Sequence, residues 1–425
     1  MATNVTASHD APLIHALDED PAPDFGHGTR RLIPPEQTLE RLRALLPILG
    51  ITRIANVTGL DHVGIPVAMA CRPLSRSLSV SQGKGLDLLA AKVSAAMESL
   101  EAYHAERVDA PMVLSSWRDL RRTVPVTDPD LLPQPVDGGF RPDLVTWWIR
   151  GYDILGHQPL WLPYELIHTD FTVPAPAGAG CFQRGSNGLA SGNHLLEAIS
   201  HGICEVVERD ALTLWPERTP EDHQARRIDP TTVYDLTCRQ LLKAYDDAAV
   251  NVALWDMTSD LGIPAFLCLI SDRDRDEWRR LYPSAGSGCH PHREIALARA
   301  LTEAAQTRLT FISGAREDVR HSHYRRLRDT TDVDVHWSKP RCHGRVFSAV
   351  TTHQTRTLRE DVRCQLDQLR HHGAEHVVVV NLTRSEIDMP VVRVVIPGLE
   401  GLGSQPGYRP GPRLTALIGR QETRT

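Results

Sequence analysis

The chain has 425 residues and a formal net charge of −6 at pH 7, with 41% hydrophobic and 24% charged residues. This length is enough for two or three average domains, or one large one, with a buried core. The charge balance lacks the basic surplus that nucleic-acid binding needs, and no apolar run approaches the ~18 residues of a membrane span. The N-terminus is polar and acidic, unlike a signal peptide. We therefore expect a cytoplasmic protein with no nucleic-acid or membrane partner.

The first quarter of the chain is predicted to hold an arm, two helices and a hairpin. Residues 1–28 are rich in Asp, Pro and His and predict a loose N-terminal arm. An apolar stripe and a preceding Pro-Pro pair predict a helix over 36–46. Residues 54–59 and 64–70 have the composition of two strands joined by a short connection, which predicts a hairpin. A longer apolar stripe predicts a helix over 86–106.

The helix predicted over 86–106 carries acidic side chains beside its apolar stripe. Ser94, Glu98 and Glu101 form a line that is turned by only about 100° from that stripe. The glutamates therefore flank the core. A solvated polar face and a cation site both remain compatible with this position.

A glycine- and asparagine-rich loop leads directly into a further amphipathic helix, which begins near Asn193. Glu197, Glu205 and Glu208 recur on one face of this helix, opposite an apolar face. Neighbouring carboxylates in such a row repel each other, although the repulsion is small on an exposed helix. Either the row is solvated, or a cation lies over it, in which case hard oxygen ligands favour Mg2+.

The remaining chain alternates predicted strands and helices. Strands are predicted over residues 147–166 (two strands around a turn), 252–257, 264–270, 376–382 and 390–396. Helices are predicted over residues 231–247, 292–311 and 357–371. The tail 401–425 is rich in Pro and Gly, and residues 398–417 are expected to be extended. The fold class is therefore α/β (α+β), with several strand–helix units.

The helix over 292–311 contains a guanidinium in an unusual position. Arg308 falls close to the apolar stripe, whereas Gln306 lies on another face. A guanidinium near a core must extend its charge to solvent or find an anion, so a phosphate and a local salt bridge are the open alternatives.

Several of these motifs together resemble the YcaO family. The residues that carry the resemblance are the run IANVTGLDHVGIPV, the VSQGKG turn, the Ser94-x3-Glu98-xx-Glu101 pattern, the NGLASGN loop with its acidic helix, and ALTEAAQTR. They occur in order over roughly residues 28–400. The resemblance implies a YcaO-type fold around an acidic ATP and magnesium site, with a flexible arm over 1–28, a catalytic domain over 29–400 and a tail over 401–425.

The resemblance also implies roles for particular residues. The expected Mg2+ ligands are Glu98, Glu101, Glu205 and Glu208. The expected ATP contacts are Arg31, Thr38, Lys84, Ser94, Asn193, Glu197 and Arg209. The expected catalytic residues are Arg209, Gln306 and Arg308.

The activity implied by the resemblance is ATP-dependent activation of a backbone amide in a ribosomally made precursor peptide. Phosphorylating the oxyanion that forms after nucleophilic attack makes the amide oxygen a leaving group. Attack by a Cys, Ser or Thr side chain of the peptide gives an azoline, and attack by external sulfide gives a thioamide. The end of this chain lacks a PxPxP terminus and resembles members that act beside a TfuA-type partner, which favours thioamidation.

Other functions remain open. One is a carboxylate–magnesium ligase for small molecules, and another is a non-catalytic subunit that binds ATP or a peptide in a sulfur-modification complex. The resemblance further implies a homodimer.

Overall fold

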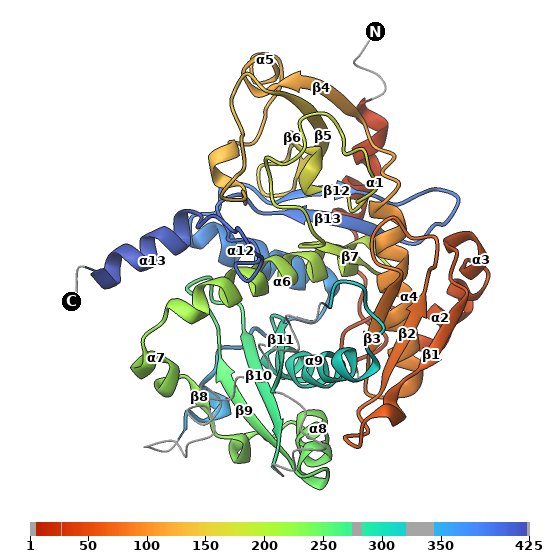
Figure 1. Ribbon diagram of the computed structural model, residues 1–425, viewed down its shortest axis with the longest axis vertical. Coiled ribbons are helices and arrows are strands. Elements are labelled where there is room, and N and C mark those ends of the chain that lie inside the picture. The colour runs from red at the N-terminus through yellow and green to blue at the C-terminus, as the bar shows by residue number, and fades with distance from the viewer. Residues whose placement is uncertain (1–5, 27, 274–282, 320–343, 423–425) are drawn as a thin grey trace. The chain divides into compact units, whose positions relative to one another are not determined.

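Figure 1 shows the computed structural model, which describes residues 6–26, 28–273, 283–319 and 344–422. The chain forms two compact units, and each is assembled from stretches that are far apart in the sequence. The first unit comprises Met1–Pro23, Leu100–Glu217 and Thr355–Thr425, and the second comprises Asp24–Ser99 and Arg218–Gln354. Each unit combines helices with antiparallel sheet, so the predicted mixture of helix and strand is confirmed.

The first unit is built on a sheet with strand order β4-β5-β12-β13-β7, to which β6 adds by pairing with β5. Its strands are β4 (Met112–Ser116), β5 (Val145–Asp153), β6 (Gln158–Pro163), β7 (Leu189–Ser191), β12 (Val378–Asn381) and β13 (Val391–Val395). The β5–β6 hairpin and the β12–β13 pair are the strands expected from the apolar runs of the sequence. Every residue of β13 is buried, as a strand that is covered on both faces requires.

Helices cover this sheet. The helices and short 3-10 turns are α1 (Thr6–Asp18), the last turns of α4 (Leu88–Ala105), α5 (Trp117–Leu120), η2 (Pro129–Leu131), η3 (Tyr164–Leu166), α6 (Leu195–Leu214), η4 (Trp215–Glu217), α12 (Leu358–His371) and α13 (Pro412–Glu422). Helix α6 packs on β13 and β7, and α1, α12 and α13 pack on α6 (Figure 1). The sheet and α6 therefore form the frame of this unit.

Both ends of the chain differ from their sequence-based expectations. Residues 6–18 form α1 instead of a loose arm, because Leu13 is buried and the carboxylate of Asp10 lies 2.6 Å from the guanidinium of Arg150 in a buried ion pair. The tail 401–425 is not extended throughout, since residues 412–422 form α13 and bury Leu414. Apolar side chains at helical spacing outweigh the local Pro and Gly content in both places.

The second unit contains two smaller sheets, one with order β1-β2-β3 and one with order β11-β10-β9-β8. Its strands are β1 (Arg53–Asn56), β2 (Val67–Cys71), β3 (Val80–Lys84), β8 (Arg227–Ile228), β9 (Val250–Asp256), β10 (Ala265–Asp272) and β11 (Ser284–Cys289). Its helices and 3-10 turns are α2 (Pro35–Arg43), α3 (Leu46–Leu49), η1 (Thr58–Leu60), most of α4, α7 (Pro220–Ala225), η5 (Pro230–Thr232), α8 (Leu236–Asp247), α9 (Arg293–Ser313) and η6 (Phe347–Ala349). The β1–β2 hairpin confirms the predicted hairpin, and β9 and β10, which pair with each other, are the strands predicted over 252–257 and 264–270.

Glycines let two helices of this unit approach strands at backbone distance. A Cβ atom on Gly83 of β3 would lie 2.0 Å from the backbone nitrogen of Ala95 in α4. A Cβ atom on Gly286 of β11 would likewise lie 2.2 Å from the backbone nitrogen of Ala304 in α9. Because no side chain separates strand from helix at these glycines, the close contact fixes where the acidic and polar residues of α4 and α9 lie along β3 and β11.

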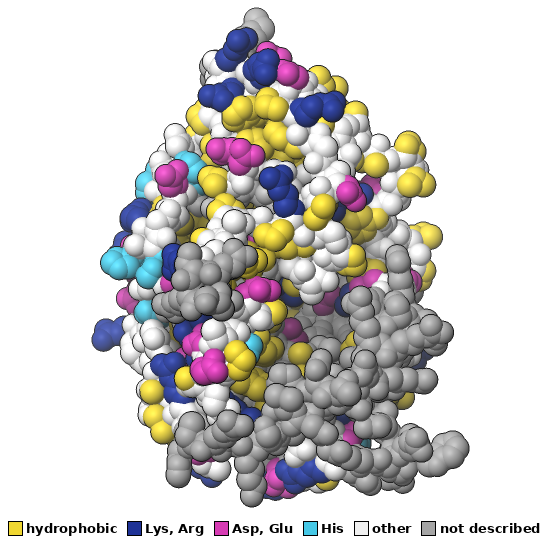
Figure 2. Space-filling view, turned by 60° about the vertical axis from the view of Figure 1, so that its left-hand side comes forward, with side chains coloured by type: hydrophobic (Ala, Val, Ile, Leu, Met, Phe, Trp, Pro, Cys, Tyr) yellow, Lys and Arg dark blue, Asp and Glu magenta, His cyan; other side chains and the backbone are white. Residues whose placement is uncertain are grey.

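Among the described residues, every helix is either too short or too polar to traverse a bilayer. On the face seen in Figure 2, basic and acidic side chains of the described residues are interspersed, with no continuous basic area.

The last helix is held by a buried ion pair that gives a testable prediction. Asp210 of α6 is fully buried, and its carboxylate accepts hydrogen bonds from the Arg413 guanidinium (2.9 Å) and the Glu400 backbone N–H (3.0 Å). Burial raises the pKa of Asp210 to about 6 although Arg413 opposes the shift. We expect Arg413→Ala to lower the free energy of unfolding by about 2 kcal/mol, because the carboxylate loses its partner.

The loss should depend on pH. Without Arg413 the folded-state pKa of Asp210 rises further, so at pH 5 the neutral acid avoids most of the penalty that the buried anion suffers at pH 8. Urea unfolding at both pH values measures this, with the exposed Arg356→Ala as the matched control. An equal loss at the two pH values would mean that Arg413 stabilises the unit only by packing.

Candidate functional site

The loop between β7 and α6 closes back onto the first turn of the helix. The backbone N–H of Asn193 donates to Oε2 of Glu197 at 2.8 Å, and the Glu197 side chain is buried. The imidazole of His194 caps the helix by accepting from the backbone N–H of Leu196 at 3.1 Å. Gly192 permits this closure, because a Cβ there would lie 2.5 Å from Cβ of Glu197. The loop thus fixes Asn193 and Glu197 relative to each other.

Further along α6, the acidic row is not a fully solvated face. Glu208 is buried, and Glu205 is partly buried with its Oε1 atom 3.6 Å from the guanidinium of Arg209. The charge of Glu205 also acts on the buried guanidinium of Arg393 on β13. Carboxylates removed from water repel each other more strongly than exposed ones, so this arrangement favours the cation alternative.

Helix α4 contributes the second acidic group. Oε1 of Glu101 accepts a hydrogen bond from the hydroxyl of Ser191 on β7 at 2.6 Å, which ties the end of α4 to the strand that precedes α6. Ser94 and Glu98 lie on the same helix and are partly buried, and the charge of Glu98 acts on Arg316. The sequence could not predict the Ser191–Glu101 contact, because 90 residues separate the two partners.

Lys84 has a carboxylate partner that the sequence did not reveal. Its ammonium forms a short ion pair with Glu303 of α9, and Glu303 also accepts a hydrogen bond from the Ser287 hydroxyl at 3.2 Å. Gln306, one turn further on, donates from Nε2 to the backbone carbonyl of Gln82 at 2.7 Å. These contacts link α9 to β3 and place Lys84 and Gln306 in one polar cluster of the second unit.

The structure resolves the alternatives for Arg308 in favour of a local salt bridge. The guanidinium is 1% exposed, with Nε 2.8 Å from Asp61 and Nη2 3.0 Å from Asp272. Two carboxylates therefore neutralise it inside the second unit, and this geometry supports a positioning role over contact with a reacting group.

The two residues expected near the N-terminus lie in the second unit. Thr38 on α2 is buried, and its hydroxyl donates to the carbonyl of Pro34 at 3.3 Å. Arg31 pairs with Phe25 through backbone hydrogen bonds in both directions and is partly buried. These contacts anchor the backbone around both residues.

The donor set fits magnesium better than a soft metal. Within the first unit the structure brings the carboxylates of Glu205 and Glu208 onto one face of α6, and carboxylate oxygens are the ligands that Mg2+ prefers. Magnesium is usually held by one or two carboxylates together with phosphate oxygens. Among the described residues, no group of three His, Cys, Asp or Glu side chains is placed to hold a metal ion.

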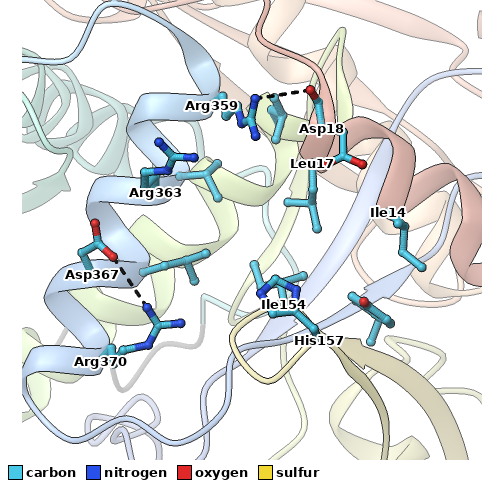
Figure 3. A pocket seen from close by; sticks show the side chains of 13 residues that line it. Ile14, Leu17, Asp18, Ile154, His157, Arg359, Arg363, Asp367 and Arg370 are labelled. Atoms are coloured by element: carbon cyan, nitrogen blue, oxygen red, sulfur yellow. Dashed lines mark hydrogen bonds and ion pairs between the residues drawn. The ribbon is translucent and has the colours of Figure 1, made fainter.

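A separate cavity of about 310 Å3 lies in the first unit between α1, α12 and the β5–β6 hairpin (Figure 3). Arg359, Arg363 and Arg370 of α12 line one side, and Ile14 and Leu17 of α1 line the other. None of the residues expected to bind ATP or Mg2+ lines this cavity, so it is not the nucleotide site that the sequence predicts.

Comparison with known sequences places these features in a family. The sequence model described as YcaO cyclodehydratase, ATP- and Mg2+-binding, matches residues 82–400. An uncharacterised protein from the tfuA 3′ region of Rhizobium leguminosarum bv. trifolii is 38% identical over 379 residues, which cover 87% of this chain and 88% of the relative. An uncharacterised protein of Methanothermobacter thermautotrophicus is 33% identical over 397 residues, covering 91% and 99%.

Solved structures share the fold. YcaO from Methanopyrus kandleri, bound with AMPPCP and Mg2+, superposes with a TM-score of 0.71 at 22% identity and covers 92% of this chain and 98% of its own. A heterocyclase in complex with substrate and cofactor gives a TM-score of 0.76 at 21% identity, covering 95% of this chain and 56% of its own. The family match, the relatives at over 30% identity and the buried acidic row on α6 lead to one conclusion: this chain belongs to the YcaO family and uses ATP and Mg2+.

Proposed function

We propose that this enzyme activates a backbone amide of a ribosomally made precursor peptide by ATP-dependent O-phosphorylation, in the cytoplasm, during natural-product biosynthesis. The observation that carries the proposal is the acidic row of α6, where Glu197 and Glu208 are buried, Glu205 is partly buried, and Glu197 accepts a hydrogen bond from the glycine-rich loop. Like charges gathered on one face of a helix and removed from water repel each other, so such a row has little structural value by itself. It becomes favourable when Mg2+ and a triphosphate lie over it.

Some residues would bind Mg2+ directly, and others would orient those ligands. Glu205 and Glu208 of α6 and Glu98 and Glu101 of α4 would hold Mg2+. When bound, Mg2+ and ATP supply the phosphoryl group and neutralise its charge. Ser191 orients Glu101 through the 2.6 Å hydrogen bond.

The nucleotide contacts proposed from the family motifs are Asn193, Glu197, Arg209, Ser94, Lys84, Arg31 and Thr38. The chain's own groups orient the phosphates and screen them from water, and the backbone closure at Gly192 keeps Asn193 and Glu197 in place. Gln306 and Arg308, which the family motif suggests as catalytic, would act by holding α9 against β3, β10 and the Asp61 loop.

The nucleophile decides the product. A Cys, Ser or Thr side chain of the peptide would give an azoline with loss of water, and external sulfide would give a thioamide. We favour thioamidation with a TfuA-like partner, since the Rhizobium relative is encoded in the tfuA 3′ region. A homodimer is the proposed assembly.

Intact mass of a candidate precursor peptide tests the reaction. The peptide is co-expressed with this protein and any TfuA-like neighbour, with the wild-type chain or with Glu205→Gln. A loss of about 18 Da would identify an azoline, and a gain of about 16 Da with a sulfur isotope pattern would identify a thioamide.

We expect Glu205→Gln and Glu208→Gln each to lower peptide-dependent ADP formation about 100-fold, because a neutral amide is a weaker Mg2+ ligand than a carboxylate. A coupled ADP assay measures this, and the exposed Glu217→Gln serves as the matched control. Full activity of both variants would rule out the proposed metal site. ATP binding without turnover across candidate peptides and partners would instead favour a non-catalytic subunit.

A further inference from the structure

Among the buried hydrogen-bond donors of the first unit that lack an acceptor, four belong to three side chains that interact electrostatically with one another. They are His168 (Nε2), Arg184 (Nε) and Arg393 (Nε and Nη1), and none of these atoms has a partner among the described residues. Buried donors of this kind destabilise a fold, because they lose their hydrogen bonds to water and gain none in return. Finding four in one neighbourhood, on groups that bear or can bear positive charge, indicates a missing ligand and not a random defect.

Arg393 is an almost completely buried cation. It lies on β13 with 2% of its surface exposed, and its Nη2 donates to the backbone carbonyl of Gly185 at 2.8 Å. No carboxylate among the described residues forms an ion pair with it, although the charge of Glu205 reaches it. Burial lowers the pKa of this guanidinium to about 10, which still leaves it charged at neutral pH.

The protonation of His168 follows from its contacts. The backbone N–H of Asp170 donates to Nδ1 at 3.2 Å, so the neutral ring carries its hydrogen on the unpartnered Nε2. The imidazole stacks on Tyr164 with a centroid distance of 4.4 Å, which fixes the direction of Nε2. Burial first, and then the charge of Arg184, lower the pKa of His168 to about 4, so Nε2 is a neutral donor near pH 7.

Arg184 supplies the route to solvent. It is partly exposed, lies 4.5 Å over the ring of Phe171, and donates through Nη2 to the backbone carbonyl of Asp170 in a short hydrogen bond. Its Nε remains without a partner among the described residues. Residues 171–175 beside it are exposed, so a small anion can approach the cluster from this side.

We infer that His168, Arg184 and Arg393 form a binding site for a tetrahedral oxyanion, namely a phosphate or phosphoryl group. All four unpartnered atoms are donors, two of the three side chains are cations that repel each other, and an oxyanion with several acceptor oxygens satisfies both requirements at once. The neighbourhood of Glu205 links the site to phosphoryl transfer, and this link rests on the proposed function. The same chemistry can come from the γ-phosphate of ATP or from the phosphate released after transfer.

Binding of inorganic phosphate to the full-length protein tests the site without any turnover. We expect isothermal titration to show a saturable phosphate site that weakens at least tenfold in Arg393→Gln and in Arg184→Gln, with the exposed Arg118→Gln unchanged. The nitrogen NMR signal of His168 Nε2 should shift when phosphate is added. Absence of phosphate binding to the wild-type chain, or unchanged affinity in both variants, would overturn the inference.

Two further measurements control for misfolding of the variants and identify the source of the bound phosphate group. Circular dichroism checks that each variant folds. If Arg393→Gln does not fold, Arg184→Gln and His168→Phe carry the test, because Arg184 is partly exposed and phenylalanine keeps a ring at the His168 position. Repeating the titration with a saturating non-hydrolysable ATP analogue and Mg2+ distinguishes the sources. Loss of phosphate binding then assigns the site to the γ-phosphate, and persistence assigns it to phosphate after transfer. Failure of the amide-activation proposal would leave these binding results intact.

Discussion

Replacing Arg308 with methionine should lower the free energy of unfolding by about 3–5 kcal/mol, the range measured when one partner of a buried ion pair is removed. Asp61 is 2% exposed on its side chain and Asp272 is 14% exposed, so both carboxylates would remain in a low-dielectric setting with their shared cation gone. Because the guanidinium also joins α9 to the loop after β1 and to β10, the loss should affect the whole second unit.

Urea unfolding measures this effect, and the exposed Arg239→Met on α8 is the matched control. Adding Asp61→Asn to Arg308→Met should recover part of the lost stability, because it removes one of the two unpaired charges. The opposite outcome is informative. Unchanged stability together with a loss of peptide-dependent turnover would return Arg308 to the catalytic role that the family motif suggests.

The elements that the sequence predicted well are those whose signal is local. The helices α4, α9 and α12 begin and end within a few residues of the predicted limits, and α6 begins within two residues of the predicted start, since each has a sustained apolar stripe. The termini were mispredicted for the converse reason. Pro and Gly counts describe local backbone preference, whereas α1 and α13 are helical because Leu13 and Leu414 find a core supplied by distant segments.

The candidate site shows the same division. The acidic row of α6 is visible in the sequence because Glu197, Glu205 and Glu208 are related by helical periodicity. The residues that surround these glutamates in the fold cannot be predicted from the sequence. Arg393 lies in a run of valines that predicts only a buried strand, and its place near Glu205 depends on the packing of α6 on β13.

Partnerships across long sequence separations were equally hidden. Glu303 had no pattern that would mark it as the partner of Lys84, since the two are 219 residues apart. A single sequence without an assembled fold therefore indicates which side chains are chemically unusual, but not which ones meet.

The second large effect is expected at the glycine contact between β11 and α9. Gly286→Ala should lower the free energy of unfolding by about 3 kcal/mol, at the upper end of the range for overpacked cores. The new Cβ would lie 2.2 Å from the Ala304 nitrogen and 2.4 Å from the Ala300 carbonyl oxygen, and neither backbone atom can move without moving the helix.

A shift of α9 in Gly286→Ala should also reduce peptide-dependent turnover. Glu303 and Gln306 belong to this helix, and they contact Lys84 and the backbone carbonyl of Gln82. Gly59→Ala is the matched control, since no described atom lies within 4 Å of its Cβ position and its φ angle is not positive. Thermal and urea unfolding of the two variants, with the ADP assay in parallel, measure both effects. If Gly286→Ala were as stable as Gly59→Ala, α9 would not rest on the strand at backbone distance, and the positioning role proposed for Gln306 would lose its basis.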